Sequence, residues 1–154
     1  MSDRPDLSRA AARVKASCAC EGLRRAARTL TRHYDDALSP SGLRVTQLPI
    51  LVGLSVAGPL PMTPLADALG MDRTTLARNV KALEERALVA VESDGEDRRR
   101  RVLALTPAGE QALSQALLLW APTQAGVEDR FGRERLHALL GELSSLAGAV
   151  GEGS

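Results

Sequence analysis

The sequence predicts a mainly α-helical fold with one small β-hairpin, and three observations support this. Apolar side chains recur every three or four residues over most of the chain, which is the spacing of one face of a helix. The chain is 44% apolar but only 2% aromatic, so its core is built from Leu, Ala and Val, a composition that favours helices. Residues 88–93 and 99–105 have the pattern of two strands around the acidic turn DGED at 94–97.

The first helix is expected to run from Ser8, its N-cap, to about Leu38. The sequence SPSG at 39–42 ends it, because Pro and Gly interrupt helices. One face of this helix is apolar along its length and consists of Cys20, Leu23, Ala27, Leu30 and Tyr34. An apolar stripe of this kind needs a partner to cover it.

Three shorter elements are expected to follow. The second helix spans residues 46–57 and ends at the Gly-Pro pair that comes next, and residues 60–62 form a short strand. Thr63 caps the third helix, which has Pro64 at its first position and Gly70 after its end.

Asp72 is expected to cap a fourth helix over residues 73–87, and this helix has two contrasting faces. The face toward the core consists of Leu76, Val80, Leu83 and Ala87. The opposite face carries small hydroxyls and long cations, namely Arg73, Thr74, Thr75, Arg78 and Lys81.

Two long helices complete the chain. Pro107 opens the first of them, Pro122 is expected to kink or interrupt it, and the Phe-Gly pair at 131–132 ends it. The last helix spans about 133–150. We therefore expect one subunit over residues 1–154, in which 8–38 and 107–150 form a helical dimerisation region around a central unit, 43–106.

The central unit has the pattern of a winged helix-turn-helix, in which one helix enters the major groove of DNA and a basic hairpin enters the minor groove. Arg78 could bind a guanine through two hydrogen bonds, while Thr74 and Thr75 could contact a thymine methyl or a phosphate. Four adjacent arginines, 98–101, concentrate positive charge at the hairpin although the chain carries a formal net charge of only +1.

Within the hairpin, Asp97 and Arg99 are two residues apart on a strand, so their side chains share a face. The carboxylate can hold the guanidinium in one orientation before DNA arrives. Arg98 and Arg100 are assigned contacts with phosphate or with solvent. The predicted DNA-binding set therefore includes Asp97, Arg98 and Arg99 from the wing.

The segment from Leu43 to Gly109 resembles the MarR family of bacterial winged-helix transcriptional regulators. Its most specific motifs are the D-x-R pattern of Asp97 and Arg99 and the sequence LTPAG at 105–109. The flanking helices also match, so the resemblance covers nearly the whole chain. It implies a homodimer built by the terminal helices, binding to a palindromic operator in double-stranded DNA, and release when a small-molecule effector or an oxidant alters the dimer.

Two cysteines, Cys18 and Cys20, are candidates for sensing. Both lie in the first expected helix, two residues apart, so their sulfurs are about 200° apart around it. A disulfide between them is therefore geometrically poor, and we expect two different sites. Arg24 lies one turn after Cys20 and favours the thiolate form, whereas Glu21 disfavours it for Cys18. Cys20 is therefore the better candidate for a reactive thiol.

Cys20 and Tyr34 also resemble the cysteine and tyrosine of the peroxide-sensing OhrR branch of this family. Fourteen residues of helix span about 21 Å, so the two side chains could meet only across a dimer. A second tyrosine expected near Val45 is absent. The alternatives are a soft metal or metalloid shared between subunits, an intersubunit disulfide, or packing of small apolar side chains in the dimer seam.

Other classes of function lack their motifs. The sequence contains no GxSxG, phosphate-binding loop or HExxH, so we expect neither an enzyme nor a cofactor. Two sulfurs and distant histidines do not predict a closed zinc site. The start of the chain is not a signal peptide and no apolar run has transmembrane length, so a cytoplasmic protein without a membrane partner is expected. The alternatives to a specific regulator, here a repressor, are an architectural DNA binder and a winged-helix protein-interaction module.

Overall fold

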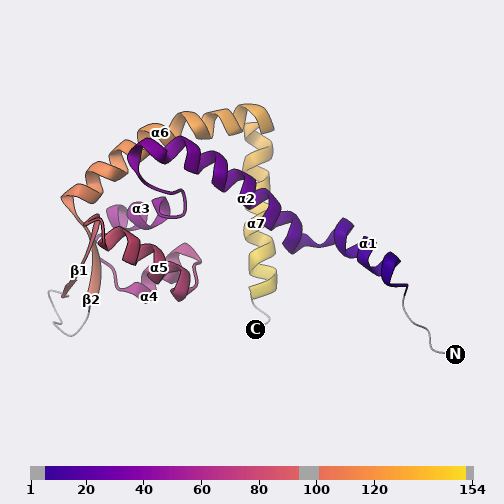
Figure 1. Ribbon diagram of the computed structural model, residues 1–154, viewed down its shortest axis with the longest axis horizontal. Coiled ribbons are helices and arrows are strands. Elements are labelled where there is room, and N and C mark those ends of the chain that lie inside the picture. Colours follow the sequence, from indigo (N-terminus) through magenta and orange to yellow (C-terminus); the bar gives the residue numbers. More distant parts are fainter. Residues whose placement is uncertain (1–5, 94–100, 152–154) are drawn as a thin grey trace.

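The computed structural model of the chain describes residues 6–93 and 101–151. It is mostly helical with a two-stranded antiparallel hairpin, as the sequence predicts (Figure 1). The elements in chain order are α1 (Leu7–Ser17), α2 (Ala19–Leu38), η1 (Ser39–Ser41), α3 (Leu48–Ala57), α4 (Met62–Leu69), α5 (Arg73–Glu84), β1 (Val89–Ser93), β2 (Arg101–Leu105), α6 (Pro107–Phe131) and α7 (Arg133–Gly151).

The buried core lies mainly in the central unit, where α3, α4, α5 and the hairpin pack together with the end of α2 and the start of α6. Its largest fully buried side chains are Leu38, Ile50, Leu51, Leu65, Leu76, Val80 and Leu83. The strands pair from Val89 opposite Leu105 to Ser93 opposite Arg101. The short strand expected at 60–62 is reduced to a single bridge between Leu60 and Leu103.

The N-terminal helix is interrupted, which corrects the expectation of one helix from Ser8 to Leu38. Asp6 rather than Ser8 caps α1, because its carboxylate accepts hydrogen bonds from the amides of Ser8 and Arg9. Cys18 has extended backbone (ψ 104°) and separates α1 from α2. Its amide still donates to Val14 and its carbonyl accepts from Gly22, so one residue closes one helix and opens the next. Ser and Cys are weak helix formers, so this break in the helix costs little free energy.

Two further helix starts differ from the expectation. The second helix begins at Leu48 instead of Thr46, because residues 44–47 form a hydrogen-bonded turn. Thr63 does not cap α4, since Pro61 is the N-cap and the helix begins at Met62. Pro64 therefore lies at the third helical position, where its missing N–H is still one that has no partner within the helix.

The helix α5 ends at Glu84 instead of Ala87, which is exposed and has a left-handed backbone (φ 55°). The amide of Ala87 donates to Glu84 (2.8 Å) and that of Leu88 to Leu83 (2.9 Å), the two bonds of a Schellman motif. The residue in the left-handed position of this motif is normally glycine, because a Cβ is strained there.

We therefore expect Ala87→Gly to raise the free energy of unfolding by about 0.5–1 kcal/mol, since relief of left-handed strain exceeds the extra entropy of an unfolded glycine. Urea unfolding monitored by circular dichroism measures this. Ala82→Gly, in the interior of the same helix, should lower the free energy by a similar amount. Destabilisation by both substitutions would mean that Ala87 is not strained.

The helix α6 runs without a break from Pro107 to Phe131 although it contains Pro122. Pro122 removes the hydrogen bond that would reach the carbonyl of Leu118. Leu118 is 76% exposed, so water can reach that end of the turn. The ribbon of α6 bends as it passes over the molecule, which is how a helix accommodates an internal proline (Figure 1). Of the two expected outcomes, a kink or an interruption, the interruption does not occur and the helix bends instead.

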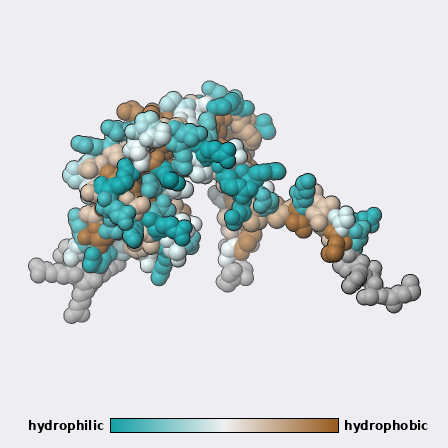
Figure 2. Space-filling view, in the orientation of Figure 1, coloured by the Kyte–Doolittle hydropathy of each residue, from teal (hydrophilic) through white to brown (hydrophobic). Residues whose placement is uncertain are grey.

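The terminal helices leave much of their apolar surface uncovered. Neither α1 nor α7 has a buried residue, and α1 extends away from the rest of the molecule (Figure 1). Figure 2 shows apolar side chains at the surface over α1. Among the described residues, no helix is both long and apolar enough to cross a membrane.

Candidate nucleic-acid interface

The helix α5 buries one face and exposes the other, as the sequence predicts. Leu76, Val80 and Leu83 are at most 2% exposed and anchor the helix against the core. Every predicted DNA-contacting residue of this helix is exposed, namely Arg73, Thr74, Thr75, Arg78 and Lys81. The structure thus presents a row of hydroxyls and cations on a rigid support.

The N-terminus of α5 is fixed by Asp72, as expected. Its carboxylate accepts hydrogen bonds from the Thr75 amide (2.8 Å) and the Thr75 hydroxyl (2.6 Å). These hydrogen bonds hold the pKa of the Asp72 carboxyl below its usual value. The Thr75 hydroxyl hydrogen is therefore already committed, and its lone pairs and methyl group remain available.

The wing is described only at its base. Arg101 is exposed at the start of β2 and pairs with Ser93. The predicted wing residues Asp97, Arg98 and Arg99 lie outside the described residues.

Tyr34 takes part in a hydrogen-bonded chain that links three helices. Its hydroxyl donates to the side-chain oxygen of Gln124 on α6 (2.5 Å), and the Gln124 amide donates to Glu128 (3.1 Å). Glu128 in turn pairs with Arg133 on α7 (2.9 Å). Burial raises the pKa of the Tyr34 hydroxyl above 10.0, and the negative charge of Glu128 raises it further.

This arrangement predicts a loss of stability in alkali. Below pH 10 the Tyr34 hydroxyl is neutral in both the folded and the unfolded chain, so its contribution to the free energy of unfolding does not change with pH. As the pH rises through 10, the unfolded chain releases the proton more readily than the folded chain does, and the free energy of unfolding falls. Denaturant unfolding from pH 8 to 11 should show this fall, and Tyr34→Phe should make it smaller.

The same titration can be followed directly, because Tyr34 is the only tyrosine in the chain. Tyrosinate absorbance should appear at a higher pH in the folded protein than in denaturant. Equal titration curves in the two conditions would contradict the burial argument.

The structure changes the geometric argument about the cysteines. Cys18 is not inside a helix but caps α2, whereas Cys20 is in its first turn. The 200° separation in one helix therefore does not apply, and it no longer disfavours a disulfide between them. Both thiols are exposed in the described chain. Cys20 and Tyr34 lie on the same helix, at its start and near its end, so they do not meet within one chain.

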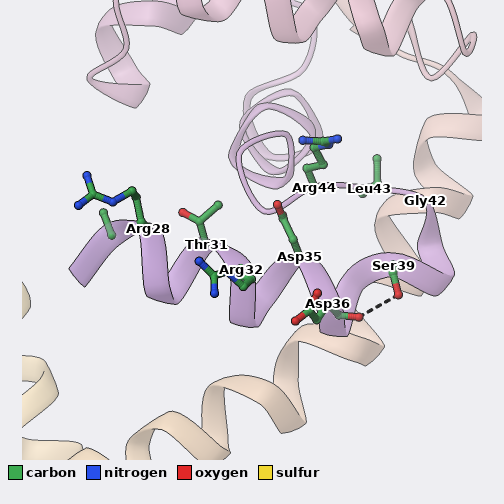
Figure 3. Close-up of a pocket in the computed structure, with 10 residues that line it drawn as sticks. Arg28, Thr31, Arg32, Asp35, Asp36, Ser39, Gly42, Leu43 and Arg44 are labelled. Carbon is green, nitrogen blue, oxygen red and sulfur yellow. Dashed lines mark hydrogen bonds between the residues drawn. The ribbon is translucent and has the colours of Figure 1, made fainter. Parts of the chain in front are cut away.

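A groove of about 740 Å³ lies between α2 and the segment that leads into α3 (Figure 3). Figure 3 shows Asp35 pointing across the groove toward the segment that carries Arg44. The other charged side chains that line it are Arg28, Arg32 and Asp36. The groove therefore adjoins both α2 and the central unit, residues 43–106, which is predicted to be the DNA-reading unit.

Sequence reasoning missed three residues whose side chains reach distant parts of the chain. Asp35, Gln124 and Arg86 each form a hydrogen bond with a residue at least 10 positions away in the chain. A spacing pattern contains no signal for such pairs. The sequence of α2 does place Asp35 next to Tyr34, but nothing in it indicates what either side chain reaches.

Comparison with known proteins agrees with this geometry. The MarR family model matches residues 41–100. The M. tuberculosis transcriptional regulator MosR, solved in complex with DNA, is 38% identical, with a TM-score of 0.76 over 87% of this chain and 98% of that chain. The chain is thus a winged-helix DNA-binding transcription regulator by fold, and it belongs to the MarR family.

Two other relatives are more distant. The repressor CouR, bound to a 23-mer DNA duplex, is 26% identical, with a TM-score of 0.76 over 88% of this chain and 95% of that chain. The Bacillus subtilis HTH-type transcriptional regulator YwoH, itself uncharacterised, is 29% identical over 89 residues, which are 58% of this chain. The aligned part spans 64% of YwoH, slightly less than two thirds of its length.

Proposed function

We propose that this chain forms a homodimeric, sequence-specific repressor that binds a palindromic operator and is released by a small ligand or by thiol oxidation. The observation that carries the proposal is the exposed face of α5, where Arg78 and Lys81 stand opposite the buried leucines. Cations and hydroxyls on a helix anchored in this way suit base edges and phosphates in a major groove. The DNA complexes of MosR and CouR, which share the fold, support this assignment.

Dimerisation is supported by the apolar surface of the terminal helices. Single chains rarely expose so many large apolar side chains on adjacent helices. The most exposed on these helices are Leu7, Val14, Leu118, Leu140 and Val150, each at least 53% exposed. A second copy that packs α1, α2, α6 and α7 against their counterparts would cover them.

Ligand release is supported by the groove beside α2. Its volume of about 740 Å³ suits a small molecule, and its charged lining from Arg28 to Arg44 suits one with ionised or polar groups. An occupant would contact both α2 and the segment that leads into α3. Its binding could therefore change the orientation of the central unit relative to α2.

Thiol oxidation gives a prediction about the cysteines. Because Cys20 is exposed and Arg24 lies one helical turn away, peroxide should release the wild-type protein from DNA, and Cys20→Ser should abolish this response. Cys18→Ser should keep it. A mobility shift with and without peroxide measures the effect. The opposite pattern would assign sensing to Cys18, and no response in the wild type would leave packing of the dimer seam as the role of Cys20.

A mobility shift of the protein on its own upstream DNA, against random duplex of equal length, tests the function as a whole. A specific repressor should bind the operator about 10³-fold or more tightly than random DNA. Binding without discrimination would instead indicate an architectural DNA binder. No binding to either DNA would favour a protein-interaction module.

A further inference from the structure

Two hydrogen bonds join the end of α2 to the DNA-reading unit. Asp35 on α2 accepts a bond from the backbone amide of Val45 (2.7 Å), and Arg86, just after α5, donates to the backbone carbonyl of Gly42 (2.6 Å). We infer that Asp35 and Arg86 are positioning residues that fix the angle between α2 and the recognition helix α5, and so the distance between the two copies of α5 on DNA. This rests on the proposed dimeric operator binding.

The bond from Asp35 holds the segment that leads into α3. The amide of Val45 lies between η1 and α3, outside any helix, so it depends on a side chain for a partner. A carboxylate acceptor makes this bond stronger than a neutral one. Leu43 and Leu48, on either side of Val45, are at most 7% exposed and belong to the core. Asp35 therefore joins α2 to the backbone at Val45, which the buried side chains of Leu43 and Leu48 hold in place.

The bond from Arg86 holds the other end of the unit. Arg86 lies two residues after Glu84, the last residue of α5, and reaches a carbonyl 44 residues earlier in the sequence. Gly42 has a left-handed backbone (φ 70°), and a Cβ there would lie 2.7 Å from Nη2 of Arg86. Glycine at this position thus permits both the turn and the close approach of the guanidinium.

The two bonds act at separate points on the same turn. The turn at 39–47 follows Leu38, the buried last residue of α2, and leads into α3, so its conformation affects the angle at which α2 leaves the core. One bond fixes the lead into α3, and the other fixes the C-terminal end of α5. Since α2 belongs to the proposed dimer region, its angle to α5 determines how far apart the two recognition helices stand.

The test uses duplexes selected by the wild-type protein from a random pool, with the two half-sites then moved closer or further apart by one or two base pairs. Wild type should lose about 10-fold or more in affinity per step, because each base pair rotates one half-site relative to the other. Asp35→Ala and Arg86→Ala should reduce this loss to about 3-fold or less. Asp35→Asn and Arg86→Lys, which retain an acceptor and a donor, should restore most of it.

Arg25→Ala is the matched control, because Arg25 is an exposed arginine on the same helix, α2, and does not line the groove. It should preserve the wild-type dependence on spacing. If the alanine variants bind every spacing equally more weakly, with the 10-fold discrimination intact, their role is structural and the inference is wrong. If wild type itself selects no paired half-sites, the proposed dimeric operator binding fails, and the inference fails with it.

Discussion

Replacing Arg78 by alanine is expected to weaken operator binding by about 1–3 kcal/mol, or roughly 5- to 150-fold. Arg78 is exposed on α5 while Leu76 and Val80 on either side of it are buried, so removal of its side chain beyond Cβ leaves the helix in place. A guanidinium that binds one guanine through two hydrogen bonds discriminates against other bases at that position alone. The loss should therefore be accompanied by relaxed preference at a single base pair.

Arg99→Ala provides the contrast, because the wing is predicted to contact DNA through its charge and not through base edges. Its loss should weaken binding to operator and random DNA by similar factors and reduce the dependence of affinity on salt by about one unit of slope. Both variants should be compared on a panel of operators, each with one base pair changed. Equal losses on all sequences from both variants would contradict the assignment of α5 as the recognition helix.

The division between buried and exposed residues could be predicted from the sequence because it follows from local periodicity. Leu76, Val80 and Leu83 recur at helical spacing, and this alone places Arg78 and Lys81 on the opposite side. The cap at Asp72 is similarly local, because a carboxylate before a helix can reach only the first amides after it.

The helix ends were less predictable, because they are decided by contacts outside the local pattern. Ala87 fits the apolar spacing of α5, yet the chain leaves the helix at Glu84 so that Leu88 can enter the core and begin the hairpin. Pro122 predicts a kink or an interruption without deciding between them, and the exposure of Leu118 and packing along α6 allow the helix to continue. In each case tertiary packing outweighs a local preference of about 1–3 kcal/mol.

The positioning residues could not be predicted, for a different reason. Asp35 and Arg86 have the sequence pattern of solvent-exposed charges, and only the folded chain brings them to Val45 and Gly42. Arginine and aspartate are common on helix surfaces, so their presence carries no information without the partner. By contrast, the start of α6 at Pro107 could be predicted, because proline is favoured at the first position of a helix.

Gly109→Ala is expected to lower the free energy of unfolding by about 2–3 kcal/mol, since added volume in a closely packed site forces the backbone to shift. Gly109 lies in the first turn of α6, and a Cβ there would overlap the backbone carbonyl oxygen of Leu88 and lie 2.7 Å from Cδ1 of Leu105. That carbonyl also accepts a hydrogen bond from the Thr106 amide (3.2 Å), so it cannot move without cost. The glycine of the LTPAG motif is thus required by the close approach of α6 to the strand.

Chemical denaturation should be compared with Gly148→Ala in α7, where an added Cβ meets open space. That control should raise the free energy of unfolding by about 0.5–1 kcal/mol, as expected when alanine replaces glycine inside a helix. Opposite signs for the same chemical change would place the cost at the contact between α6 and Leu88 and not in helix propensity. A change of less than about 0.5 kcal/mol in Gly109→Ala would mean that the helix tilts away easily, and that its approach to Leu88 does not require glycine.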